Sequence, residues 1–175
     1  MLRTALRTAL AATLLLAACS DDEDEPGASV FIGEMTGAYT ASLSGEAVFG
    51  VTLDDAAKAA GSALILGGGG PLRIVLFGYT TAKPRAGTYE IVAPDSPASS
   101  DTVFQGSISY RVAGASQAYE IRSGSITFTL INHNRVTGRL DLRAERTFPA
   151  DGAQISIIGT FDAGQIPQVF PPQQD

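Results

Sequence analysis

VTGRLDLRAE, residues 136–145, carries the clearest structural pattern in this chain of 175 residues. Leu140, Leu142 and Ala144 alternate with Arg139, Asp141 and Arg143, so every second side chain is apolar. Successive side chains of a β-strand point to opposite faces, and this period places the apolar residues on one face and the charged residues on the other. The stretch therefore predicts a half-buried antiparallel strand with a salt-bridged outer face.

The same alternation recurs along the chain, and it predicts about nine short strands. These are centred on residues 39–43, 47–51, 63–66, 72–79, 89–91, 108–112, 126–130, 140–144 and 155–161. Glycine, proline or asparagine separates most of them, as in the links between antiparallel strands. We expect an all-β fold, a single antiparallel β-sandwich or small β-barrel. The only helical candidate is Asp54–Ala60, and the lack of crossover helices excludes a parallel α/β architecture.

The N-terminus has the composition of an export signal. Arg3 and Arg7 are followed by an uncharged, mostly apolar stretch from Thr8 to Ala18. This stretch is shorter than the roughly 20 apolar residues that a membrane-spanning helix needs. Residues 1–18 are therefore predicted to be a secretory signal peptide.

The end of this segment, Leu16-Ala17-Ala18-Cys19, resembles the lipobox of bacterial lipoprotein precursors. The resemblance implies cleavage after Ala18 and a diacylglyceryl thioether on the Cys19 sulfur, so the membrane is the expected partner. Two or three acyl chains hold a protein firmly, whereas one gives marginal binding. Cys19 is the only cysteine, which excludes an internal disulfide in the oxidising compartment.

The predicted organisation has four parts. Residues 1–18 are the signal peptide, 19–35 the lipidated cysteine with a flexible acidic tether, 36–164 the β domain, and 165–175 a flexible C-terminal tail. Acidic residues 21–25 either form a self-repelling spacer or resemble the surface-export signal of some Gram-negative lipoproteins. Ser20, directly after the lipidated cysteine, implies by resemblance the outer membrane of the cell envelope. Whether the domain faces the periplasm or the cell surface stays open.

A second resemblance covers most of residues 37–164. The pieces Pro84–Tyr89, Gly124–Phe128, Val136–Leu140 and Ile157–Phe161 are similar to the strand endings of small all-β bacterial lipoproteins of unknown function. In these motifs the glycines bend strands and the aromatic residues fill the core. The resemblance implies a fold and an envelope location, and it transfers no catalytic residue.

Charge excludes one class of partner. The formal net charge is −6, and removal of residues 1–18 takes away two arginines and no acid, which leaves −8. Nucleic-acid binding needs a basic stripe that displaces counterions, so no nucleic-acid partner is expected.

Catalysis has few candidate residues. His133, the only histidine, lies in a predicted hairpin tip, no nucleophile motif accompanies it, and Cys19 is consumed by lipid. Asp141 and Glu145 are the strongest candidates for a hydrolytic carboxylate pair, but the alternating arginines indicate a salt-bridged face. Gly67–Gly70 lacks the Lys-Ser/Thr ending of a phosphate loop. No enzymatic activity is expected.

Metals and cofactors are not expected either. One histidine and no free cysteine cannot supply a zinc or redox-metal site. Calcium needs only oxygen ligands, but the loop aspartates lack calcium-loop spacing and are interpreted as solvated. These aspartates are Asp54, Asp55, Asp95, Asp101 and Asp151.

Residues 72–77 depart from simple alternation, because Val75 and Phe77 make the second face apolar as well. Such a strand needs cover on both sides, from Asp54–Ala60 or from Val30–Ile32. The alternative is an apolar cavity or a partner-binding patch.

From the whole sequence we expect a lipid-anchored, non-enzymatic binding or structural protein whose protein or small-molecule partner is unknown. The alternative is a lipocalin-like carrier that holds an apolar ligand at Phe77, Tyr79 and Phe128, and a carboxylate-dependent hydrolase ranks third.

Overall fold

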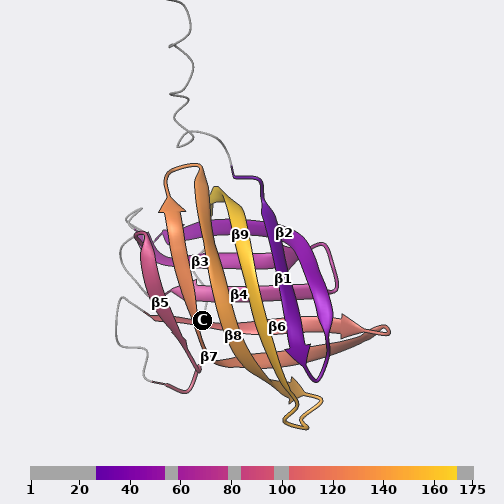
Figure 1. Cartoon of the computed structure of the whole chain (residues 1–175). Helices are drawn as coiled ribbons and strands as arrows, with labels where there is room; N and C mark the ends of the chain where they lie inside the picture. The colour runs from indigo at the N-terminus through magenta and orange to yellow at the C-terminus, as the bar shows by residue number, and fades with distance from the viewer. Residues whose placement is uncertain (1–26, 54–58, 79–83, 97–102, 169–175) are drawn as a thin grey trace, which may run out of the picture.

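The computed structural model describes residues 27–53, 59–78, 84–96 and 103–168 of the chain (Figure 1). These residues form nine strands and no helix. The strands are β1 (Val30–Gly37), β2 (Ala41–Leu53), β3 (Ala59–Gly68), β4 (Leu72–Gly78), β5 (Gly87–Val92), β6 (Val103–Val112), β7 (Ala115–Ile131), β8 (Arg135–Phe148) and β9 (Gln154–Gln168). The prediction of an all-β fold with about nine strands is confirmed.

All nine strands belong to one sheet that closes in a ring. The order around the ring is β1, β2, β3, β4, β6, β5, β7, β8 and β9, and β1 pairs with both β2 and β9. The pairing is antiparallel except between β2 and β9 and between β5 and β6. Figure 1 shows β1, β8 and β9 crossing steeply in front of β2, β3 and β4. The closed sheet therefore has two crossing layers with a common interior.

Strand β7 passes from one layer to the other. Its first part, to Glu120, pairs with β6, and its second part, from Ser123, pairs with β5. Between them lies a register shift, because Ile121 pairs with Ala144 while Ser123 pairs with Arg143, and Arg122 is the extra residue. A β-bulge of this kind bends its strand and increases the local twist.

Two predicted boundaries are wrong. The tether was expected to reach residue 35, but β1 begins at Val30, and its Phe31 and Met35 are buried in the core with 0 % exposure. The C-terminal tail was expected from residue 165, but β9 continues to Gln168 and pairs with β2. Both errors concern segments whose strand structure depends on distant partners and not on a local alternating pattern.

The prediction of a short helix at Asp54–Ala60 is wrong for its last two residues. Ala59 and Ala60 open strand β3, and residues 54–58 lie outside the described part of the chain. The predicted strands at 39–43 and 47–51 are largely one strand, β2, which begins at Ala41.

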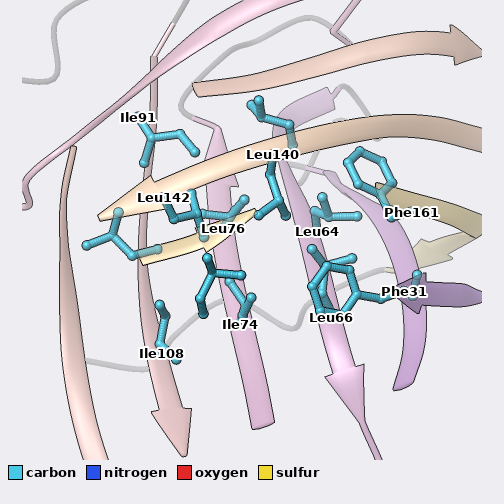
Figure 2. Packing of buried hydrophobic residues seen from close by; sticks show 14 of the residues in the cluster. Phe31, Leu64, Leu66, Ile74, Leu76, Ile91, Ile108, Leu140, Leu142 and Phe161 are labelled. Carbon is cyan, nitrogen blue, oxygen red and sulfur yellow. The ribbon is translucent and has the colours of Figure 1, made fainter. Parts of the chain in front are cut away.

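The core lies between the two layers and is built by the inward face of each strand (Figure 2). On β8, Leu140, Leu142 and Ala144 are buried, while Arg139 and Arg143 are exposed, as the alternation predicts. Figure 2 shows Leu140 and Leu142 facing Leu76 and Leu64 from the other layer. The apolar face of β8 thus packs across the interior.

Glycines of the repeated motifs lie under aromatic rings. A methyl group on Gly159 would lie 2.5 Å from a ring carbon of Phe31, and one on Gly138 would lie 2.7 Å from the ring of Phe161. A side chain at either position would displace the ring above it. The glycines therefore let these rings lie flat against the sheet, which explains the motif structurally.

Leu142→Ala should lower the free energy of unfolding by about 2–5 kcal/mol, because it removes buried methylenes and leaves a cavity. Arg143→Ala on the outer face should cost less than about 1 kcal/mol, since exposed charges contribute little. Chemical denaturation of the soluble domain, expressed from Ser20 onward, measures both. Equal small losses would mean that β8 is not half buried.

Candidate functional site

The interior of the closed sheet was the first candidate site, because a carrier would hold its ligand there. Phe128 of β7 is 1 % exposed and lies at the centre of a group of rings. Its ring centroid is 6.1 Å from that of Phe49, 5.6 Å from Tyr89, 5.8 Å from Phe104 and 6.0 Å from Phe161. These edge and tilted contacts are the usual packing of aromatic cores. The protein's own rings occupy the space around Phe128.

The structure does not bring the three predicted carrier residues together. Phe77 points to the outer surface with 44 % of its area exposed, opposite Gln105 of β6, whereas Phe128 points inward. Tyr79 lies outside the described residues. Phe77 and Phe128 are therefore on opposite faces of the sheet and cannot line one pocket.

Strand β4 is apolar on both faces, as the sequence indicates. Leu72, Ile74 and Leu76 fill the interior, and Val75 and Phe77 face outward. Val30–Ile32 does not cover them, because it belongs to β1, which pairs with β2 and β9. The other proposed cover, residues 54–58, lies outside the described part.

One end of the closed sheet carries a polar network around Arg146 of β8, whose side chain is 11 % exposed. Its Nη1 donates to the hydroxyl of Tyr39 at 3.1 Å and to Oε1 of Gln117 at 2.9 Å. Gln117 donates to Tyr39 and accepts from Tyr119, each at 2.8 Å. On the outer side, Arg146 donates from Nε to Asp151 Oδ1 at 2.7 Å and from Nη2 to the second carboxylate oxygen. This network joins four parts of the chain and closes the core.

The network shifts the ionisation of its members. The hydrogen bond from Arg146, with one from the Ala153 amide, lowers the pKa of Asp151. Hydrogen bonds from Gln117 and Arg146 lower the pKa of Tyr39, whereas burial raises the pKa of Tyr119. The shift of Asp151 favours its ionised, Arg146-paired form, and the shift of Tyr119 favours a neutral hydroxyl, whereas the shift of Tyr39 favours its ionised form. The network therefore has the properties of a structural element that holds one end of the sheet together.

A second candidate lies on the outer face of the front layer, which we call the outer groove. It encloses about 490 Å³. Ile32 of β1 and Ile158 of β9 are 59 % and 62 % exposed and form its apolar end. Arg139 and Asp141 lie beside them on β8, and the hydroxyls of Thr88, Ser125, Thr127 and Thr160 line the rest. The groove therefore combines apolar side chains, both charge signs and hydroxyls on a rigid sheet.

The predicted salt-bridged face of β8 is wrong for most of its charges. Glu145 pairs with Arg122 of β7 at 3.3 Å, through the bulge, and not with Arg143. In the described residues Arg139 and Asp141 form no ion pair.

The candidate catalytic residues do not assemble into a site. His133 lies in the hairpin between β7 and β8, where its Nε2 is 3.0 Å from Nδ2 of Asn134. Asp141 and Glu145 are four residues apart on one strand, about 14 Å. A glycosidic acid and base need at most about 9.5 Å. This carboxylate pair, which the sequence already disfavours as a hydrolytic site, is therefore too widely spaced as well.

The remaining candidates lie in loops or outside the described residues. Asp95 and Asp151 are described, and Asp54, Asp55 and Asp101 are not. The described residues contain no group of three or more histidine, cysteine or acidic residues that could hold a metal ion. Leu16, Ala17, Ala18 and Cys19 fall outside the described part. Gly67 and Gly68 end β3, and Gly69 and Gly70 lie in the short turn before β4, in the hairpin that the sequence predicts.

Sequence reasoning missed the Arg146 network. The available signal was the end of the alternation after Ala144, where Glu145, Arg146 and Thr147 are all polar. Its partners come from positions up to 107 residues away, which no local pattern reveals.

Comparison with known proteins adds no relative. No family model, no curated protein and no solved structure matches the chain. Within the described ranges, no helix is long and apolar enough to cross a membrane.

Asp151→Asn tests whether the ion pair between Arg146 and Asp151 stabilises the fold, through the pH dependence of the stability. Because the folded pKa of Asp151 is lowered, the unfolded chain binds the proton first as pH falls. The wild type should be more stable than the variant at pH 7, and the difference should shrink as pH falls below the ordinary aspartate value of 3.8. Thermal unfolding across pH measures this.

Asp141→Asn is the matched control, because Asp141 is exposed and has no ion pair among the described residues. It should show no such pH-dependent difference. If both variants lost stability relative to the wild type by equal amounts and with the same pH dependence, the stabilising ion pair of Asp151 with Arg146 would be contradicted.

Proposed function

We propose that this chain is a lipid-anchored, non-enzymatic protein of the bacterial cell envelope that acts through the outer surface of its closed sheet. The filled interior carries the proposal. The core residues pack across the space between the layers, and the rings around Phe128 occupy its centre. Side chains that pack across the interior argue against the carrier alternative, and the outer surface is then the part that would contact a partner.

The way in which β1 enters the domain supports an anchor at the N-terminal side. The Gly27 amide donates to the Asn134 carbonyl at 3.4 Å, and the Ala47 amide donates to the Ser29 carbonyl at 3.0 Å. These bonds fix the first described residues at the end of the sheet that carries the β7–β8 hairpin. Eight residue steps from Cys19 to Gly27 span at most about 28 Å. A lipid on Cys19 would therefore keep this end near the bilayer, with the Arg146 end pointing away.

The outer groove is the surface that best fits the proposed binding role. Single exposed apolar residues are ordinary, but Ile32 and Ile158 are diagonal neighbours across the β1–β9 pair, because Ile32 pairs with Thr160. Arg139 and Asp141 are available for ionic contacts beside this apolar pair. Such a mixture of an apolar centre and polar surroundings is typical of protein interfaces. We infer that a protein of the envelope is the partner of this groove.

The hydrolase alternative receives no support from the described geometry. It needs a carboxylate pair at bond-cleaving distance, and the pair that the sequence offered is too widely spaced. No described observation favours a second function.

Cys19→Ala tests the anchor. The precursor should remain uncleaved by the lipoprotein signal peptidase and should incorporate no labelled palmitate, because the acceptor sulfur is gone. Metabolic labelling with an immunoblot measures both. A variant that still acquires lipid would overturn the anchor, and Ser20→Ala is the control expected to retain labelling.

Density-gradient fractionation of the envelope tests the location. Because Ser20 follows the lipidated cysteine, the protein should be recovered mainly with the outer membrane. Recovery mainly with the inner membrane would contradict this sorting.

A further inference from the structure

The outer surface of the back layer contains a hollow of about 210 Å³ between the β3–β4 turn and the β6–β7 pair. We call it the arginine hollow. It is lined by the turn Gly67–Pro71 and by Arg73, Ser109, Arg111 and Ser116. Figure 1 shows the β3–β4 turn and the β6–β7 hairpin projecting on the same side of the molecule. This site is separate from the outer groove, which lies on the front layer.

Strand register places the two arginines on one face. Arg73 of β4 lies directly opposite Ser109 of β6, and Arg111 is two residues further along the same strand. Arg111 in turn lies opposite Ser116 of β7. Diagonal neighbours in an antiparallel pair have Cα atoms about 7–8 Å apart, within reach of one shared ligand for side chains as long as arginine. The Arg111 amide donates to the Pro71 carbonyl at 2.8 Å, which holds this end of β6 against the turn.

Neither arginine is neutralised by the described residues. Arg73 and Arg111 are exposed and form no ion pair or side-chain hydrogen bond there. Two acids are nearby. Glu120, opposite Ser107 on the same face, is bound to Arg122 at 2.8 Å. Glu46 of β2 lies opposite Gly68 at the rim of the hollow, with its Oε2 3.4 Å from where a Gly68 side chain would begin. Two like charges therefore face one hollow in a chain whose net charge is −6.

The chemistry of the hollow selects its ligand. Guanidinium groups donate hydrogen bonds and carry no acceptor, and the serine hydroxyls can donate as well. Gly69 has φ +81, and no atom lies within 4 Å of where its side chain would be, so the turn leaves the hollow open. Paired guanidinium groups bind phosphate and sulfate oxygens through short, charge-assisted bonds. We propose that the arginine hollow binds a phosphate or sulfate group.

This differs from a phosphate-binding glycine loop. Gly67–Gly70 leads through Pro71 into strand β4 and not into a helix, so no helix N-terminus contributes. The glycines provide space, and the arginines on the neighbouring strands provide the charge. The proposal is independent of the lipid anchor, because none of its residues belongs to the N-terminal segment.

The test uses the full-length protein in a non-ionic detergent with inorganic phosphate as the probe. Phosphorus NMR line broadening, at ionic strength held constant with sodium chloride, gives the affinity. The wild type should broaden the phosphate line in a saturable way. Arg73→Gln/Arg111→Gln should weaken binding by about tenfold or more, because charge-assisted bonds are lost. Arg73→Lys/Arg111→Lys should retain part of the binding, because it keeps the charge without the fork geometry.

The matched control is Arg85→Gln/Arg143→Gln, which removes the same charge from exposed arginines outside the hollow. It should change the affinity by less than about threefold, since distant surface charges are screened by salt. Equal weakening in the two glutamine double variants, or no saturable broadening by the wild type, would overturn the proposal.

A parallel titration with glycerol phosphate distinguishes the two sources of such a group. Tighter binding of glycerol phosphate than of inorganic phosphate indicates a lipid headgroup, and the reverse order indicates the free ion. Either order supports the hollow only if the affinity depends on Arg73 and Arg111.

Discussion

Strand β1 lies between β2 and β9 and pairs with both, and these pairings complete the ring of strands. β2 and β9 pair directly only from Val48 and Gly164 onward, so without β1 their remaining lengths would present unpaired edges beside the apolar face. By inserting there, β1 satisfies the edges and places Phe31 and Met35 into the interior. The Phe31 ring lies against Gly159 of β9, so the closing strand also packs on the strand that it joins. β1 therefore contributes both backbone pairing and buried side chains where the ring closes.

Closure has a functional consequence because the enclosed volume is filled. Phe128 contacts rings contributed by four other strands, and the Arg146 network joins Tyr39, between β1 and β2, to β7 and β8 at one end of the sheet. A partner would then contact the outer surface of the sheet, where the two layers present different side chains. The front layer presents isoleucines with one arginine and one aspartate, and the back layer presents two arginines beside a glycine turn. The closed sheet therefore presents two chemically different outer surfaces.

The period-two pattern was sufficient to predict the fold class and the inward residues of β8, because alternation is a local property of a half-buried strand. The number of strands was also predicted, but partly through errors that cancelled. Two predicted strands belong to β2, and β1 was assigned to a tether because Val30–Ile32 shows no alternation of its own. The first half of β7 was missed although Tyr119 and Ile121 alternate there with Glu120 and Arg122. Neither the Arg146 network nor the arginine hollow was predictable, since each unites residues from different strands whose register the sequence does not state.

The central claim is that the protein's own side chains fill the interior of the closed sheet. The most direct test is a fluorescence titration of the soluble domain with the apolar dye N-phenyl-1-naphthylamine. The account predicts no saturable binding by the wild type. Phe128→Ala is the positive control, because removal of a buried ring leaves a cavity that can admit an apolar molecule. Saturable one-to-one binding by the wild type, displaced by a fatty acid, would contradict the account and would favour a carrier.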